Sequence, residues 1–471
     1  MAASACAGLL LVAIAAIGTT YTYNVMLASR LEALHKLTST ASKENNESST
    51  DLSENRTNFD IFNPFNNSED DYLVKRRVRG RSSWNLKQRW AGKQKTSSKT
   101  TAAGASSHQL WCFVRREALA SSQYGFGRLP LGLCSVIVYQ SVIITFKDIR
   151  VDLASQDIDF DERRGGMKKL ASLKRLNPSI QVYVQLGEPD QPPMLHSADQ
   201  KRKRDSPNGV LQALLTASDA VLQDFATGVS LWISSRHLDG LAVDLRGAVL
   251  SLEPNDTGTN ITTRFAHICY ERLRKDDVGF VLLLPEDPVL FARYDMNALL
   301  NTGSLKLIQK SHYVSGLTKA SCLSPYKAPD LSVERIVNRT LNAVPNLMSR
   351  VLLSVTFTGA FFFVDDELAR NPANVTAFMQ AAYHGFLPYR EVCRRVLRGQ
   401  WWAVTNVATD CIEAGRATEW ASCFGPASGY WLVSLKGVLG GLAVFDVDGD
   451  DFDGSCGERH ILLSRLQDLL A

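Results

Sequence analysis

An acid and a base stand two positions apart in the segment 237–247, which reads HLDGLAVDLRG. Apolar side chains occupy every second position in it: Leu241, Val243 and Leu245. This alternation predicts a buried β-strand with Asp244 and Arg246 on its opposite face, near its C-terminal end. A carboxylate beside a guanidinium can form an ion pair, act on a reacting group or bind an anionic ligand. In a barrel of parallel strands, chemistry takes place at that end.

Such a pair needs a scaffold of strands, and from Leu110 onward short apolar runs alternate with amphipathic segments. Eight runs are predicted as strands: Leu110–Arg115, Ser135–Thr145, Ile180–Gly187, Leu238–Leu245, Val278–Pro285, Leu305–Tyr313, Arg350–Thr358 and Gly440–Asp446. Helices are predicted at Met167–Leu176, Val210–Ser235, Thr262–Arg274, Ser332–Met348, Leu432–Val438 and Arg459–Leu470. The alternation predicts an α/β fold, a (β/α)8 TIM barrel over 108–471. A small α+β insertion subdomain, about 364–439, is expected between the seventh and eighth strands.

The composition suits a large globular body with a polar stalk. The chain has 471 residues, 45% of them hydrophobic, and a formal net charge of only +4. Residues 30–107 are rich in Ser, Thr, Asn and basic residues, so we expect a disordered stalk. Its basic run from Lys75 to Lys99 reads as a solvated linker, with binding to anionic glycans, lipids or nucleic acid as the alternative. The tract Lys75–Arg79 could also be a protease processing site. We expect no nucleic-acid partner.

The N-terminus and the sequons favour the secretory pathway. Residues 1–29 contain an apolar core without charged residues from Ala2 to Ser29, which predicts either a cleaved signal peptide or a signal-anchor helix in the membrane. Potential N-glycosylation sites occur at Asn46, Asn55, Asn66, Asn255, Asn260, Asn338 and Asn374. Nine cysteines with no CxxC pair favour disulfides over a zinc site. We therefore expect an extracellular protein, secreted or membrane-anchored, with no metal and no cofactor.

Over about Gln109 to Ala471 the chain resembles the family-18 glycoside hydrolases, the chitinases and chitinase-like proteins. The best match is GGLAVFDVDGDDFDGSCG, residues 440–457, which is similar to the family's ending G-x-x-x-W-s-x-D-x-D-D-f-x-G-x-C. Further matches are LNPSIQVYVQLG, RVLLSVTFTGAFF and GFLPYREVC, at 176–187, 350–362 and 385–393. They follow one another in the family's order.

The resemblance aligns the opening segment with the family's D-G-x-D-x-D-x-E strand. In active members the Glu protonates the glycosidic oxygen, and the middle Asp steers the substrate's own N-acetyl group toward the anomeric carbon. Here Asp239 and Asp244 match, but Ala242 replaces the middle Asp and Arg246 replaces the Glu. A guanidinium with a pKa above about 12 does not donate a proton near neutral pH. The resemblance therefore implies a protein without catalytic residues.

Other positions of the implied ligand cleft also depart from the family. They are Gln185, His312, Tyr313 and Phe445, beside Asp244 and Arg246. Phe445 stands where the family has a Trp, so it is either a remaining apolar platform or part of the barrel core. His312 is expected to be a hydrogen-bonded core histidine. Asp244 with Arg246 is expected to be a structural ion pair, and the alternative is that Arg246 recognises an anionic ligand.

The resemblance also implies two disulfides, Cys112–Cys134 and Cys393–Cys456. Four further cysteines remain in the body of the chain: Cys269, Cys322, Cys411 and Cys423. Our preferred pairing is Cys411–Cys423 with Cys269–Cys322, because the first two share the insertion subdomain.

The sequence thus predicts a catalytically inactive chitinase-like protein that acts as a binding or signalling scaffold. Its partner is expected to be a protein or a glycan, chitin and N-acetylglucosamine oligomers included. Two alternatives remain: a weak glycan lectin that uses the old cleft, and a hydrolase whose acid has moved to another carboxylate such as Glu188 or Asp446.

Overall fold

Residues 109–147, 150–155, 157–187, 207–250, 252, 258–312, 319–329, 331–345, 348–364, 377, 379 and 381–470 are described by the computed structural model. The predicted signal or anchor segment and the stalk lie outside these residues. So do Tyr313, Glu188 and five of the sequons: Asn46, Asn55, Asn66, Asn255 and Asn374. Asn260 and Asn338 are described, and both are exposed.

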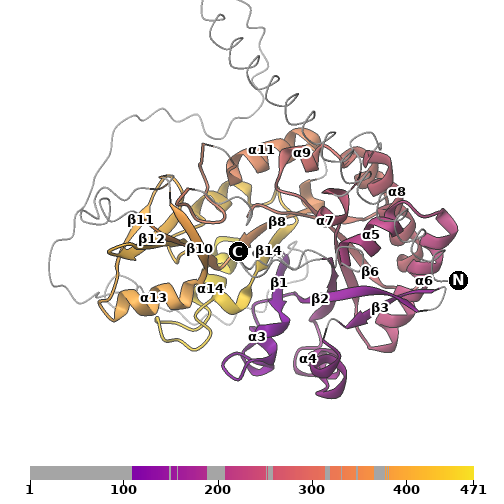
Figure 1. Ribbon diagram of the computed structural model, residues 1–471, viewed down its shortest axis with the longest axis horizontal. Coiled ribbons are helices and arrows are strands. Elements are labelled where there is room, and N and C mark those ends of the chain that lie inside the picture. The colour runs from indigo at the N-terminus through magenta and orange to yellow at the C-terminus, as the bar shows by residue number, and fades with distance from the viewer. Residues whose placement is uncertain are drawn as a thin grey trace, which may run out of the picture. The chain divides into compact units, whose positions relative to one another are not determined.

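Eight parallel strands close into a barrel, which confirms the predicted TIM-barrel fold (Figure 1). In spatial order they are β1 (Gln109–Arg115), β2 (Val136–Lys147), β4 (Gln181–Leu186), β5 (Gly240–Asp244), β6 (Gly279–Leu284), β7 (Lys306–Gln309), β8 (Val351–Thr356) and β14 (Gly441–Phe445). Each lies within one of the eight predicted runs, allowing one residue at the start of β1 and two at the end of β2. The extended end of β2 also pairs antiparallel with β3 (Arg150–Ser155).

Helices return the chain from each strand to the next. They are α3 (Arg116–Ala120), α4 (Gly166–Leu176), α5 (Pro207–Leu215), α6 (Asp219–Ser235), α7 (Arg246–Leu250), α8 (Gly258–Arg274), α9 (Pro288–Phe291), α10 (Met296–Asn301), α11 (Val333–Ala343) and α14 (Ile461–Leu470). Three expected helices differ. In place of the predicted helix 432–438 there is a 3-10 helix over Tyr430–Leu435. The predicted helix 210–235 is broken where Ser218, the residue before α6, adopts an extended conformation. The predicted helix 332–348 stops at Ala343 because Pro345 disfavours helical geometry in Val344.

Period-two alternation divides the core into two parts. Leu241, Val243 and Leu245 of the opening segment pack outward in the large cluster under the helices, as their spacing predicts. Ala242 points into the barrel. The apolar interior of the barrel consists of Trp111, Phe113, Val136, Val138, Tyr183, Ala242, Val281, Leu283, Ile308, Leu352, Ala443 and Phe445.

A second sheet lies between β8 and β14 in sequence. It is antiparallel, and its five strands follow the order β10 (Ala382–Pro388), β9 (Thr358–Phe363), β13 (Glu419–Cys423), β12 (Cys411–Arg416) and β11 (Trp402–Asn406). The helix α13 (Tyr389–Leu397) follows β10, and a 3-10 helix, Tyr430–Leu435, precedes β14. We call this region the insertion sheet. Trp401 and Trp420 are buried in its packing.

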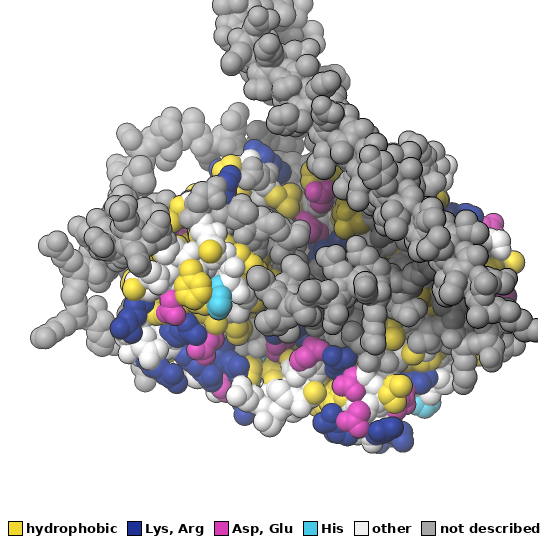
Figure 2. Space-filling model, in the orientation of Figure 1, with side chains coloured by type: hydrophobic (Ala, Val, Ile, Leu, Met, Phe, Trp, Pro, Cys, Tyr) yellow, Lys and Arg dark blue, Asp and Glu magenta, His cyan; other side chains and the backbone are white. Residues whose placement is uncertain are grey.

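Basic and acidic side chains are interspersed on the described surface seen in Figure 2, including the region around α13. On α13 itself, Arg394 pairs with Asp453 and Arg395 pairs with Glu391. Exposed pairs of this kind contribute little to stability individually, about 0–1 kcal/mol each.

Candidate functional site

The end of β5 positions an ion pair at the mouth of the barrel. β5 ends at Asp244, and Arg246 begins α7 two residues later, so both side chains lie at the C-terminal edge of the strand. The Arg246 guanidinium donates from Nε to Asp244 Oδ1 at 2.9 Å and from Nη2 to Oδ2 at 2.6 Å. The backbone N–H of Arg246 also donates to Asp244 Oδ1, at 3.1 Å. With side chains only 15% and 3% exposed, the pair is a desolvated, two-pronged contact.

A second carboxylate reaches the same guanidinium from the next strand. Glu286 lies two residues beyond β6, and its Oε2 accepts from Arg246 Nη1 at 3.3 Å. Its side chain is 10% exposed. Arg339 of α11 holds this segment by donating to the carbonyl of Glu286 at 2.9 Å. One cation therefore lies between two carboxylates that come from adjacent strands.

Glu286 is a site residue that the sequence reasoning missed. A signal was present, because Glu286 and Asp287 follow directly on the predicted strand Val278–Pro285, at the same edge of the sheet as Asp244. Tyr294 lies near this ion pair, because the charges of Asp244, Arg246 and Glu286 all act on its phenol. Burial, and then the negative charge of Asp244, raises the pKa of the Tyr294 phenol well above its usual value. Its hydroxyl has no hydrogen-bond partner among the described residues.

The other expected cleft residues lie around the barrel mouth and are buried. Gln185, in β4, accepts a hydrogen bond from Gln140 of β2 at 3.1 Å. The Nδ1 atom of His312 lies 3.0 Å from Ser354 Oγ, and its ring lies 4.6 Å from that of Phe445. Tyr313 lies outside the described residues. His312 and Phe445 are thus in direct contact, whereas Gln185 interacts with a different neighbour.

Phe445 belongs to the interior of the barrel rather than to an exposed platform. It is 1% exposed and stacks on Phe113, with ring centroids 4.1 Å apart. The ammonium of Lys310, itself fully buried, lies 5.3 Å from the centre of the same ring. The ring therefore stacks within the core instead of offering a free face.

Asp239 is separated from the rest of its motif. It precedes β5, so it lies at the opposite end of the strand from Asp244. Its carboxylate accepts from the backbone N–H of Val182 at 2.8 Å and pairs with Lys174 at 2.6 Å. These contacts tie α4, β4 and β5 together at the base of the barrel.

A second cationic side chain at the barrel mouth, Arg115, is also paired with carboxylates. Arg115 ends β1 and lies 2.6 Å from Asp448 and 3.4 Å from Asp446. The charge of Asp446 is the largest cause of a raised pKa for the Arg115 guanidinium. Asp446 was considered as a relocated acid, and in the structure it is an ion-pair partner.

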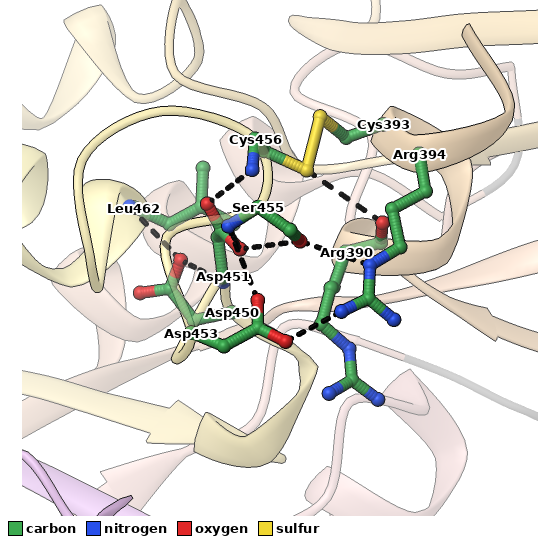
Figure 3. The surroundings of a disulfide bond; sticks show 9 residues. All are labelled: Arg390, Cys393, Arg394, Asp450, Asp451, Asp453, Ser455, Cys456 and Leu462. Atoms are coloured by element: carbon green, nitrogen blue, oxygen red, sulfur yellow. Dashed lines mark hydrogen bonds and ion pairs between the residues drawn. A yellow bond between two sulfur atoms is a disulfide. The ribbon is translucent and has the colours of Figure 1, made fainter. Parts of the chain in front are cut away.

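The carboxylates of the C-terminal motif, residues 446–457, hold the loop around them together by hydrogen bonds (Figure 3). Asp450 accepts hydrogen bonds from the backbone N–H groups of Leu462 and Leu463, which caps α14. Asp451 accepts from the N–H groups of Ser455 and Cys456. Burial raises the pKa of Asp450 to about 6. These carboxylates lie within a structural turn.

The disulfides agree with the sequence reasoning in part. The two implied by the resemblance are present: Cys112–Cys134 and Cys393–Cys456, the latter joining α13 to the C-terminal motif (Figure 3). The preferred pairing of the other four was wrong. Cys322 bonds Cys411, and Cys269 and Cys423 are buried free thiols.

The preferred pairing was wrong because closeness in sequence does not show which cysteines are neighbours in the fold. The segment after β7 packs on the insertion sheet and brings Cys322 to Cys411, with Cα atoms 6.5 Å apart. Three disulfides among the described residues indicate an oxidising compartment.

In the part of the chain that the structure describes, no group of three or more His, Cys, Asp or Glu side chains could hold a metal ion. No helix there has the length and apolar character needed to cross a membrane.

Known structures identify the fold. No family model matches the sequence, and no curated protein matches it. The Group IV chitinase of Ostrinia furnacalis is similar with a TM-score of 0.64 and 16% identity, over 77% of this chain and 99% of that one. YKL-39, solved in the presence of chitooligosaccharides, has a TM-score of 0.60 and 18% identity, over 77% and 99%.

A chitinase of Cycas revoluta in complex with (GlcNAc)3 is similar with a TM-score of 0.61 and 12% identity, over 77% of this chain and 100% of that one. Each of these matches covers 77% of this chain at low identity. Together with the closed parallel barrel, they show that this chain has the fold of the family-18 chitinases and chitinase-like proteins.

Proposed function

We propose that this chain is a catalytically inactive chitinase-like protein that acts outside the cytosol as a binding or signalling scaffold. The observation that carries the proposal is the arrangement around Arg246. The motif resemblance aligns this residue with the family's acid Glu, and its guanidinium bonds to both Asp244 and Glu286. Such a group holds its proton at any physiological pH, so the position cannot supply general acid catalysis.

The neighbouring carboxylates do not replace the missing acid. Asp244 and Glu286 both bond to the Arg246 guanidinium, so both carboxylates are engaged in this ion pair and do not face a free cleft. Ala242 has no side chain that could orient an acetamido group. A barrel that keeps its fold while this position is filled by a buried ion pair suits a protein selected for binding.

A fluorogenic chitobioside tests this proposal. The purified chain should release no fluorophore above a buffer blank from pH 4 to 8, while an active chitinase assayed in parallel releases it. Turnover by the wild-type chain would overturn the proposal. If turnover were seen, Glu286→Gln and Asp446→Asn variants would identify the relocated acid.

A glycan lectin is the second candidate. It is favoured by YKL-39 and the Cycas revoluta chitinase, whose structures were solved with N-acetylglucosamine oligomers. If this chain binds such glycans, chitin beads should retain it and (GlcNAc)4 should elute it. Flow-through at every protein concentration would exclude the lectin and leave a protein partner.

The location is proposed to be extracellular, with the chain either secreted or anchored as a type II membrane protein. The three disulfides, the apolar segment within residues 1–29 and the sequons support it. N-terminal sequencing of the mature protein distinguishes the two forms, because cleavage removes the apolar segment. Peptide N-glycosidase treatment should lower the apparent mass if the sequons are used.

A further inference from the structure

The two edges of the insertion sheet are built differently. At the β10 edge the pairing with β9 shifts register between Tyr383 and Gly385, and the strand ends in Pro388. A bulge and a proline both discourage another strand from adding there. At the other edge, β11 pairs with β12 in unbroken register. Its sequence WAVTN has no charge and no proline, so it lacks the usual protection of an edge strand.

The unprotected edge is open and partly apolar. Val404 is 51% exposed and Val407, just beyond the strand, is 89% exposed. Thr405 between them is also exposed. Among the described residues no strand pairs with the outer side of β11, which lies at the margin of the insertion sheet in Figure 1.

The edge is also held in a fixed shape. Asn406 closes the turn after β11 by accepting from the backbone N–H groups of Ala408 and Thr409, and its amide donates to Glu413 at 2.6 Å. The Cys322–Cys411 disulfide joins β12 to the segment after β7. A strand that is ordered before binding loses less conformational entropy when it pairs.

We propose that β11 pairs with β11 of a second copy of this chain, antiparallel and about a two-fold axis. In such a pairing each strand faces its own sequence, so any charged side chain would lie near its own copy. An uncharged strand with Val404 at its centre avoids this repulsion, and its β-branched residues favour cross-strand contact. The two insertion sheets then form one continuous sheet. This inference does not depend on the proposed function.

The test is the oligomeric state of the purified full chain, measured by sedimentation velocity across a concentration series. One strand pair is a small interface, so we expect a reversible dimer with a Kd of about 10 μM. Thr405→Lys should weaken the dimer at least tenfold by placing like charges near each other. Thr405 is preferred over Val404 because Val404 lies opposite the buried Glu413 in the sheet.

Two further samples make the result specific. Thr216→Lys, an equally polar and exposed position between α5 and α6, should leave the dimer unchanged. An equimolar mixture of Thr405→Lys and Thr405→Glu chains should restore dimers, because opposite charges then meet across the axis.

A wild-type chain that stays monomeric at 100 μM would overturn the proposal. So would a dimer that Thr405→Lys does not weaken, or variants whose mixture fails to associate. If the wild type is monomeric but binds another protein through this edge, the partner is not a second copy.

Discussion

Arg246 shows how one residue changes the chemistry available at the end of a strand. Its position beside Asp244 is compatible with catalysis when only the sequence is considered. In the structure its guanidinium is occupied by Asp244 and by Glu286, a residue forty positions away along the chain. Arg246, Asp244 and Glu286 thus form a buried ionic connection between the ends of β5 and β6. Removing one partner would leave a charge that is neither paired nor well solvated.

Arg246→Met should destabilise the protein by about 3–5 kcal/mol, because two buried carboxylates then lose their shared cation. Thermal unfolding monitored by circular dichroism measures the loss. Adding Asp244→Asn to the variant should recover part of it, since one of the unpaired charges is removed. Arg274→Met, at an exposed ion pair of α8, should stay within about 0.5 kcal/mol of wild type. Equal effects at both positions would contradict the role given to the buried bridge.

Introducing the carboxylates that the motif resemblance implies, with Ala242→Asp and Arg246→Glu together, should not produce hydrolysis. Ala242 is fully buried in the apolar barrel interior, so an aspartate there would be desolvated. The new Glu would also lie near Asp244 and Glu286 with no cation between them. Chitobioside turnover is the measurement, with circular dichroism to verify folding. Turnover by a folded double variant would contradict this expectation.

The insertion sheet contains a buried carboxylic acid whose ionisation affects the stability of the folded state. Glu413, in β12, is buried and accepts a hydrogen bond from Asn406. Burial raises the pKa of Glu413 to about 7, from an ordinary value near 4.5, although the hydrogen bond from Asn406 acts in the opposite direction. The folded state therefore binds a proton more tightly than the unfolded state. Its stabilising effect is complete below about pH 4.5 and is lost as the pH rises through 7.

Glu413→Gln should remove this loss, because glutamine stays neutral and can still accept from Asn406. Relative to wild type, the variant should gain on the order of 1–3 kcal/mol between pH 5 and pH 8. Urea unfolding at both pH values gives the difference. Glu458→Gln, at an exposed position after β14, serves as the control and should show no such pH-dependent gain. A constant difference at the two pH values would exclude Glu413 as the titrating group.

At the scale of the whole molecule, disulfides join elements that are distant in the sequence. Cys322–Cys411 connects the segment after β7 to the insertion sheet across 89 residues, and Cys393–Cys456 connects α13 to the C-terminal motif across 63. Closing long loops restricts the unfolded chain, which contributes about 2–5 kcal/mol per disulfide. The remaining thiols of the described body, Cys269 and Cys423, lie within the core.

Alkylation of the native protein should therefore leave Cys269 and Cys423 unmodified, because both are buried and burial raises the pKa of Cys423 to about 12. In urea without reductant, both should react, and non-reducing peptide maps should contain the Cys322–Cys411 cross-link. Native labelling of either thiol, or a Cys411–Cys423 peptide, would contradict the assignment. Cys322→Ser should lower the melting temperature more than Cys269→Ser.

The sequence by itself determined the barrel, because eight short apolar runs alternate along the chain with amphipathic segments of helical length. The outward set Leu241, Val243 and Leu245 follows directly from spacing. Helix ends at Ser218 and Val344 were missed, since an extended residue at Ser218 and the proline after Val344 interrupt an otherwise continuous apolar pattern.

Only the tertiary structure decided which side chains form ion pairs and disulfides with one another. Arg246 meets Glu286, and Cys322 meets Cys411, through contacts between elements far apart in the chain. Periodicity fixes which face of an element is buried, but the group on the facing element depends on how the elements pack. The motif resemblance therefore pointed to Arg246 as the position of interest. The fold decided that its guanidinium is paired with two carboxylates from adjacent strands.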